Sequence, residues 1–148
     1  MDPTEPVTAF ARVPAWLAQA GRACEVAPGG ELAHCRYHDD GLGALVALRA
    51  VRTAAGSPWI ALSIALGPAP SFRVRAALVA NDALVIGALV EAEGVMLLRE
   101  TLPLASLTFA QLDQALRALV HTAARIVVAS RGQDPADAAD GGLGYLFT

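Results

Sequence analysis

Lysine is absent from the sequence, and all eleven basic residues are arginines. This absence excludes a phosphate-loop lysine, a lysine Schiff base and a lysine general base. The arginines are scattered singly along a chain whose formal net charge is −3, so no basic patch is available for a nucleic-acid backbone. The sequence therefore predicts no nucleic-acid partner.

Cysteine is scarce as well. Cys24 and Cys35 are too few for a disulfide framework, and they fit reduced thiols. The N-terminal sequence MDPTEP is acidic and broken by proline, without the basic and apolar regions of a signal peptide. We therefore expect the protein to be cytoplasmic.

Long apolar runs are also missing. The longest uncharged run, residues 53–72, is interrupted by glycine and proline, and its apolar part is only WIALSIAL. A helix that spans a bilayer needs roughly 20 apolar residues, so we expect no membrane insertion. Even so, 55% of the residues are hydrophobic, which favours an apolar surface shared with another chain, most simply in a homodimer.

Catalytic signatures are lacking too. The chain has no Gly-x-Ser-x-Gly elbow, no glycine-rich phosphate loop and no His-Glu-x-x-His motif. His34, Cys35 and His38 suggest zinc, but His34 and His38 would lie about 13 Å apart in a strand, with Cys35 on the opposite face. We expect no catalytic residue, no metal and no cofactor, and an enzyme that uses its histidines is left as a minor alternative.

The first half of the chain has the patterns of one helix and three strands. Residues 5–20 carry apolar side chains at helical spacing, which predicts a helix that Pro14 kinks or restarts. Three extended segments follow, and the turn-rich sequences between them predict an antiparallel meander. These segments are residues 31–38, 43–53 and 58–66.

The second half predicts a helix and then a hairpin. Residues 71–82 are expected to form a helix capped by Ser71. Residues 83–103 predict two strands joined by a turn at Glu91 to Gly94. The helix is expected to bury a stripe made of Phe72, Leu78 and Val79.

The clearest local signal is the sequence LTFAQL. Thr108 and Gln111 have the spacing of a capping box, and Leu107 with Leu112 forms the matching hydrophobic staple. Apolar residues then recur every three or four positions, so a helix should run to near Ser130.

The last 18 residues differ in composition from the rest. An acidic, proline-containing sequence, RGQDPADAAD, leads to the apolar GGLGYLFT. The sequence thus predicts a single α+β domain over residues 1–130, and an acidic linker with an apolar tail over residues 131–148. The tail is either a motif for another protein or a segment that packs on its own sheet, through Tyr145, Leu146 and Phe147.

The predicted order is helix, three-strand meander, helix, two-strand hairpin and long helix, an α+β sandwich. Within it, residues 72–126 resemble the Tir-chaperone family, the class I type III secretion chaperones, and the related YbjN-like superfamily. The likeness rests on Leu78 to Asn81, on the strand around Gly87, on GVMLLRETLPL and on LTFAQL. Residues 1–70 agree in element order only.

The resemblance implies a small, cytoplasmic homodimer without enzymatic activity, which holds a largely unfolded segment of a secreted effector or other client protein. The expected client surface consists of Val13, Trp16, Leu17, Val46, Leu48 and Trp59. The expected dimer contact consists of Phe72, Val74, Leu78, Val85 and Leu89. The alternative is a YbjN-like regulatory or assembly adaptor that binds a folded partner through its tail.

Overall fold

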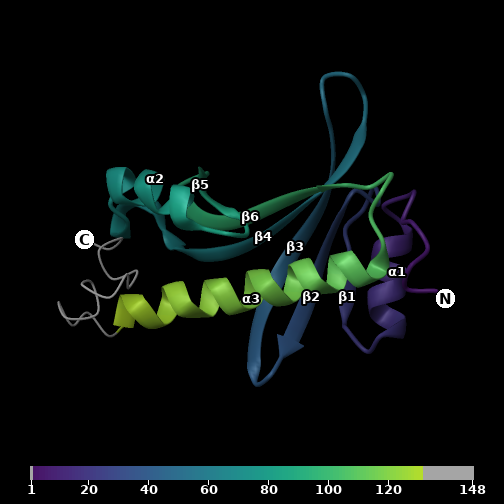
Figure 1. Cartoon of the computed structure of the whole chain (residues 1–148), viewed down its shortest axis with the longest axis horizontal. Coiled ribbons are helices and arrows are strands. Elements are labelled where there is room, and N and C mark those ends of the chain that lie inside the picture. Colours follow the sequence, from purple (N-terminus) through teal and green to yellow (C-terminus); the bar gives the residue numbers. More distant parts are fainter. Residues whose placement is uncertain (1, 132–148) are drawn as a thin grey trace.

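The computed structural model describes residues 2–131, which form an α+β structure (Figure 1). Within these residues a six-stranded antiparallel sheet has the order β1-β2-β3-β4-β6-β5. Its strands are β1 (Cys24–Val26), β2 (Leu32–Asp39), β3 (Leu42–Arg52), β4 (Pro58–Pro68), β5 (Ala88–Ala92) and β6 (Val95–Pro103). The helices are α1 (Arg12–Gln19), α2 (Val74–Ala83) and α3 (Phe109–Arg131). The α+β class predicted from the sequence is confirmed.

The predicted meander is present as β2, β3 and β4, which pair in sequence order. Strand β1 was not predicted. It has only three residues, too few for an alternating pattern to be recognised, and it pairs with β2 at the edge of the sheet.

The first helix begins later than its apolar spacing predicts. α1 starts at Arg12, which places Pro14 in the first turn, where a backbone N–H has no partner within the helix. The residues before it pair instead with the segment that precedes α3: the N–H of Val7 donates to the carbonyl of Leu107, and Pro6 forms a β-bridge with Thr108.

The start of α3 agrees with the predicted capping box. The backbone N–H of Thr108 donates to Oε1 of Gln111 over 2.9 Å, and the N–H of Gln111 donates to Oγ1 of Thr108 over 3.2 Å. Leu107 and Leu112 are both buried beside this cap. Local chemistry therefore fixes where the longest helix begins.

The prediction for α2 was wrong in two respects. Ser71 does not cap it, because its hydroxyl donates to the carbonyl of Pro68 over 2.6 Å, within a short 3-10 helix (Ala69–Ser71). Leu78 and Val79 are 65% and 62% exposed, although Phe72 is buried. α2 instead buries its small side chains, Ala77 and Ala80.

The hairpin turns where the sequence predicts, but its first strand is shorter. Glu93 and Gly94 both have positive φ, 50° and 79°, which is typical of a type I′ turn. β5 begins at Ala88 because residues 84–87 cross close to β6. A Cβ on Gly87 would lie 3.3 Å from the carbonyl oxygen of Arg99, and Gly87 has a φ of 75°.

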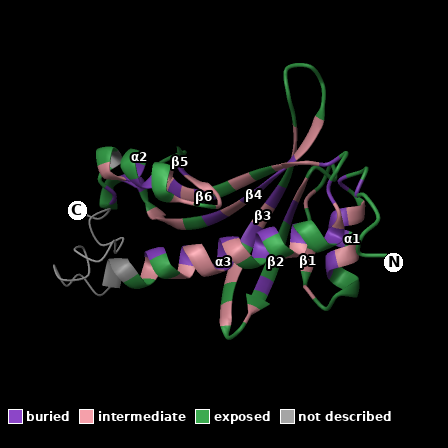
Figure 2. Ribbon diagram, in the orientation of Figure 1, coloured by how far each residue is buried: buried purple, intermediate pink, exposed green. Residues whose placement is uncertain are grey.

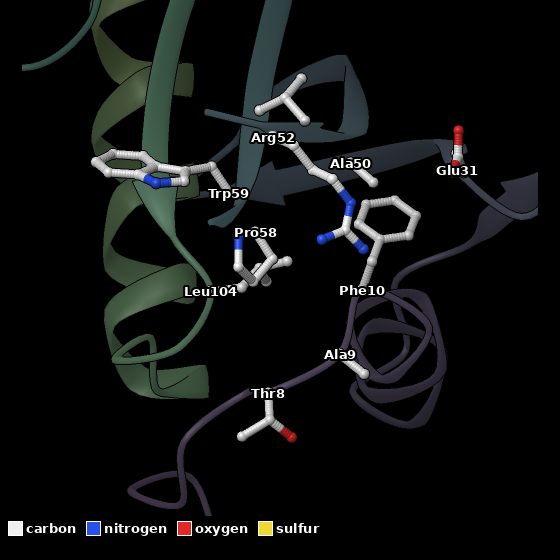
Figure 3. A pocket seen from close by; sticks show the side chains of 10 residues that line it. Thr8, Ala9, Phe10, Glu31, Ala50, Arg52, Pro58, Trp59 and Leu104 are labelled. Carbon is white, nitrogen blue, oxygen red and sulfur yellow. The ribbon is translucent and has the colours of Figure 1, made fainter. Parts of the chain in front are cut away.

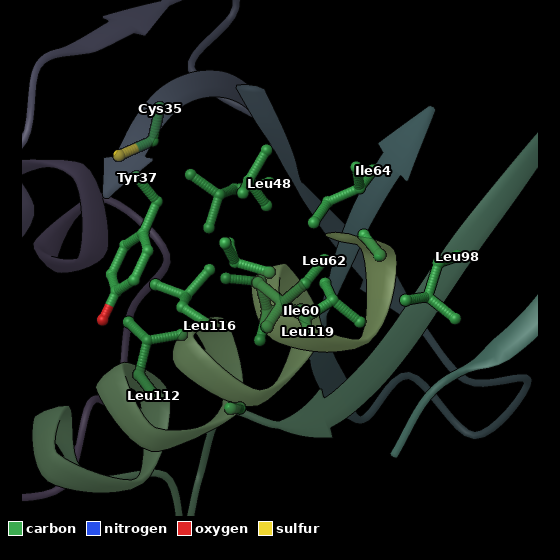
Figure 4. Packing of buried hydrophobic residues seen from close by; sticks show 14 of the residues in the cluster. Cys35, Tyr37, Leu48, Ile60, Leu62, Ile64, Leu98, Leu112, Leu116 and Leu119 are labelled. Atoms are coloured by element: carbon green, nitrogen blue, oxygen red, sulfur yellow. The ribbon is translucent and has the colours of Figure 1, made fainter. Parts of the chain in front are cut away.

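The core lies between α3 and one face of the sheet. Figure 2 shows buried residues gathered where α3 crosses the strands, and in Figure 4 Leu112, Leu116 and Leu119 point from the helix toward the sheet. The strands oppose them with fully or nearly buried side chains, namely Tyr37, Val46, Leu48, Ile60, Leu62, Ile64 and Leu98.

Leu116→Ala should lower the free energy of unfolding by about 2–5 kcal/mol, because it removes a fully buried side chain from this core. Gln114→Ala, on the exposed side of the same helix, should change it by no more than about 0.5 kcal/mol. Urea denaturation of both variants measures the difference. Equal destabilisation would contradict the packing described for α3.

Candidate functional site

The outer face of the sheet carries an exposed mixture of basic and apolar side chains. Side chains alternate along β2 and β3, so that Cys35 and Val46 are buried while His34, Arg36 and Leu45 are exposed. Such alternation is typical of an antiparallel sheet with one solvated face. The exposed residues of this face include His34, Arg36, His38, Leu45, Arg49, Ala65 and Arg99.

A hollow opens on this face beside the edge strand. It has a volume of about 340 Å³ and is lined by β1, β2 and β3. We call it the outer hollow, and its residues are Ala23, Glu25, His34, Arg36 and Leu45. Its walls combine an acidic residue, an arginine, a histidine and two apolar side chains.

Strands β3 and β4 separate at one end and leave a second hollow. Their register ends at Ala47 opposite Ser63, although β3 begins at Leu42 and β4 continues to Pro68. The gap has a volume of about 430 Å³, and α3 forms its floor. We call it the β3–β4 wedge, lined by Gly43, Ala44, Leu45, Ile64, Ala65 and, from α3, Val120, Ala123, Ala124, Val127 and Val128.

A third hollow, of about 470 Å³, lies where the N-terminal segment meets the β3–β4 hairpin (Figure 3). Trp59 forms one wall, and Figure 3 shows the guanidinium of Arg52 beside the ring of Phe10. Arg52 also donates to the carbonyl of Gly56 over 3.1 Å. This Trp59 hollow therefore offers aromatic walls with a cation between them.

Three stretches of strand edge differ in what faces them. At β5, the amide of Asn81 donates to the carbonyl of Leu89 over 3.1 Å and accepts its N–H over 2.6 Å. At the end of β2, Arg22 donates to the carbonyl of His38 over 2.6 Å. Both side chains occupy backbone groups that another strand could use.

The outer edge of β1 has no such cover within residues 2–131. Hydrogen bonds from Ala27 to Leu32 and from Arg36 to Ala23 alternate along the β1–β2 pair. Their spacing directs the backbone of Glu25 toward β2, and that of Cys24 and Val26 away from the sheet. Val26 is 51% exposed, and within residues 2–131 no hydrogen bond reaches the outward backbone groups of Cys24 and Val26, although α1 lies near this strand.

A polar cluster joins the turn after α1, strand β2 and helix α3. The hydroxyl of Tyr37 donates to Asp113 over 2.7 Å, and the guanidinium of Arg22 lies 4.1 Å from the centre of the Tyr37 ring. Asp39 contacts both Arg117, at 3.3 Å, and His121, at 2.7 Å. These contacts hold the C-terminal end of β2 against α3.

Burial raises the pKa of the Tyr37 hydroxyl to about 12, and its hydrogen bond to Asp113 contributes to the shift. Burial likewise raises the pKa of Cys24 and, to about 12, that of Cys35, which lies opposite Cys24 in the β1–β2 register. Because the thiolate is the reactive form, neither thiol is activated as a nucleophile.

Four of the six predicted client-binding residues are inside the core. Val13, Leu17, Val46 and Leu48 have no exposed surface, since they face the helices or the inner side of the sheet. The two tryptophans are half-buried. Trp59 lines its hollow, whereas Trp16 stacks on Phe109 with ring centres 4.8 Å apart.

The predicted dimer residues are also divided. Phe72 and Leu89 are buried, while Leu78 is 65% exposed and Val85 is fully exposed. With Val79, these two form what we call the α2 patch. The side chain of Val74 and the tail residues Tyr145, Leu146 and Phe147 lie outside the described residues.

No sequence pattern indicates the residues at the sheet edges and in the outer hollow. Val26 lies in a strand that is too short to predict. Alternation shows that Leu45 and Val46 face opposite sides of the sheet, but it does not show which side is buried. Arg22 follows the first predicted helix and Asn81 lies near the end of the second, but no nearby residue indicates that their side chains would hydrogen-bond to strand backbones.

No protein-family model matches the chain, and no curated protein matches it in sequence. Among residues 2–131, no three of the His, Cys, Asp and Glu side chains gather closely enough to hold a metal ion. None of the helices in this range has the length and apolar character needed to cross a membrane.

Asn81→Ala should lower the free energy of unfolding by about 1–3 kcal/mol, because it leaves the N–H and the carbonyl of Leu89 without their partner. Asp82→Ala changes the adjacent exposed residue and should have an effect of no more than about 0.5 kcal/mol. Urea denaturation separates the two. Asn81 would have no role at the edge if both variants unfolded alike.

Stability should also fall at alkaline pH because of Tyr37. Between pH 10 and about 12 the unfolded chain loses the phenol proton that the folded chain retains, so the free energy of unfolding decreases as pH rises. Tyr37→Phe should lower stability at pH 8 and flatten this decline. Denaturant titrations over the pH range test it, and an unchanged slope in the variant would contradict the assignment.

Proposed function

We propose that the protein is a non-enzymatic chaperone that acts as a homodimer and holds a largely unfolded segment of a client protein, such as a secreted effector. The observation that carries this proposal is the open outer edge of β1, next to a hollow on an uncovered sheet face. It agrees with the resemblance of residues 72–126 to the class I secretion chaperones.

The client segment binds by strand addition. The N–H and carbonyl groups of Cys24 and Val26 point outward from β1, and an extended chain can hydrogen-bond to them without unfolding either partner. The client cannot pair equally well with every strand edge, because the side chains of Asn81 and Arg22 already hydrogen-bond to backbone groups of β5 and β2. The client is thereby directed to β1.

Client side chains bind beside the added strand. The outer hollow presents Leu45 on β3 next to Arg36 on β2, with Glu25 on β1, so it accepts an apolar or polar side chain of moderate size. The Trp59 hollow offers a larger aromatic wall for a second anchor. Backbone bonds supply affinity with little sequence dependence, and the two hollows supply selectivity.

The homodimer forms through the α2 patch. Leu78, Val79 and Val85 are large apolar residues, each more than 60% exposed, and they come from one helix and the segment that follows it. Large apolar side chains exposed so near one another in sequence favour a surface that another chain covers. A second copy places the same side chains opposite, which makes the contact self-complementary.

Val26→Pro tests the client edge. Proline removes the outward N–H of Val26 but leaves the β1–β2 hydrogen bonds, which involve its neighbours. The tagged protein, purified from its host, should retain a client whose binding segment is unfolded when made as a peptide. Val26→Pro should bind that peptide roughly tenfold more weakly, in keeping with one lost hydrogen bond and a steric clash.

Val26→Thr is the matched control, because it keeps the N–H and the β-branched shape. It should bind the peptide like the original protein, as measured by isothermal titration calorimetry. A partner that is already folded, or that binds Val26→Pro and the original protein equally, would sink the strand-addition proposal and favour the adaptor alternative.

Leu78→Ser with Val79→Ser tests the dimer. The original chain should sediment at twice its 15.3 kDa mass at micromolar concentration, and the double variant at the mass of one chain. Val26→Thr, at the opposite end of the sheet, should remain dimeric. Analytical ultracentrifugation gives the masses, and a monomeric original protein would refute the homodimer.

A further inference from the structure

The β3–β4 wedge has the features of a place for one more strand. Its walls are two strands that pair elsewhere but separate here, and its floor is the apolar side of α3 at Val120 and Ala124. Leu45 is 53% exposed at its mouth, and Val128 is 67% exposed at its far end. An apolar hollow of about 430 Å³ is thus open within residues 2–131.

Backbone groups of β3 point into this wedge. The N–H of Thr53 donates to the carbonyl of Ser57 in the β3–β4 hairpin. Backbone groups alternate in direction along a strand, so those of Ala47 point toward β4, and those of Leu45 and Gly43 point to the same side. Since the β3–β4 register ends at Ala47, no described strand pairs with Leu45 or Gly43 on that side. β4 is less suited than β3 to pair with an added strand, because the register between β4 and β6 shifts between Ala65 and Gly67.

We propose that residues 141–148 of the same chain, GGLGYLFT, fill the β3–β4 wedge as a strand paired with β3. The sequence of residues 141–148 has the two-residue period of a strand. Leu143, Tyr145 and Phe147 alternate with Gly142, Gly144 and Leu146, which gives one bulky apolar face in a strand. That face packs on α3, and backbone bonds form to Gly43 and Leu45.

The chain is long enough to reach. α3 is described to Arg131, and the wedge floor begins at Val120, eleven residues and about 17 Å back along the helix. Residues 132–140 can span up to about 30 Å when extended. The tether also makes the strand's effective concentration high, on the order of millimolar.

Charge favours the same position. The linker carries Asp134, Asp137 and Asp140 and has no basic residue after Arg131. Beside the wedge, Arg36 lies opposite Leu45 in the β2–β3 register, and Arg99 lies opposite Ser63 in the β4–β6 register. Opposite charges therefore guide the linker across the mouth of the wedge.

Amide hydrogen exchange of the full chain, followed by NMR, tests this directly. The N–H groups of Gly43 and Leu45 should exchange at least tenfold faster in the variant Tyr145→Ser, Phe147→Ser than in the original protein. Leu146→Ser, on the other side of the strand, is the matched control and should keep the slow exchange. The N–H of Val46, which faces β2, should be unaffected in all three proteins.

The slow exchange of the Gly43 and Leu45 amides should not depend on protein concentration, because the added strand comes from the same chain. Fast exchange at both amides in the original protein, or slow exchange that survives Tyr145→Ser, Phe147→Ser, would overturn the proposal. Protection that grows with concentration would also overturn it and would assign the wedge to a second copy. None of these outcomes bears on the client edge at β1, which Val26→Pro tests separately.

Discussion

The packing of one long helix across one face of a twisted sheet is the contact on which the structure depends. α3 lies against β2, β3, β4 and β6, and its fully buried leucines hold these strands together (Figure 4). A single helix, about 10 Å wide, covers only a strip of one face. On the opposite face, side chains such as Arg36, Leu45 and Arg99 are exposed within residues 2–131.

The twist of the sheet explains why the wedge lies where it does. Strands turn relative to one another by roughly 20° per neighbour, whereas α3 is nearly straight. In Figure 1 the β2–β3 end and the β4–β6 end diverge on either side of the helix. Beyond Ala47 and Ser63 the two pairs cannot stay in register, so the helix itself becomes the floor between them.

Sequence patterns predicted what local chemistry determines. The capping box at Thr108 and the alternation of residues 43–53 each depend on near neighbours, and α3 and β3 formed as expected. The site was less predictable, since it depends on contacts between distant segments. Alternation shows that Val46 and Leu45 lie on opposite faces, but the face that α3 covers is decided by tertiary packing. In α2 the expected stripe failed at Leu78 because small alanines allow closer packing.

The edges of the sheet differ in how many of their backbone groups are already hydrogen-bonded. Free strand edges pair readily with other chains, and here Asn81 and Arg22 occupy backbone groups at two of them. The outer hollow and the β3–β4 wedge meet at Leu45, whose side chain lines both. If the proposed client strand adds to β1 and the proposed tail strand pairs with β3, then β1, β2 and β3 lie between the two added strands, and Leu45 borders both hollows. Under these two proposals, a strand in the wedge would form part of the surroundings of Leu45, and the tail would affect which client side chain fits the outer hollow.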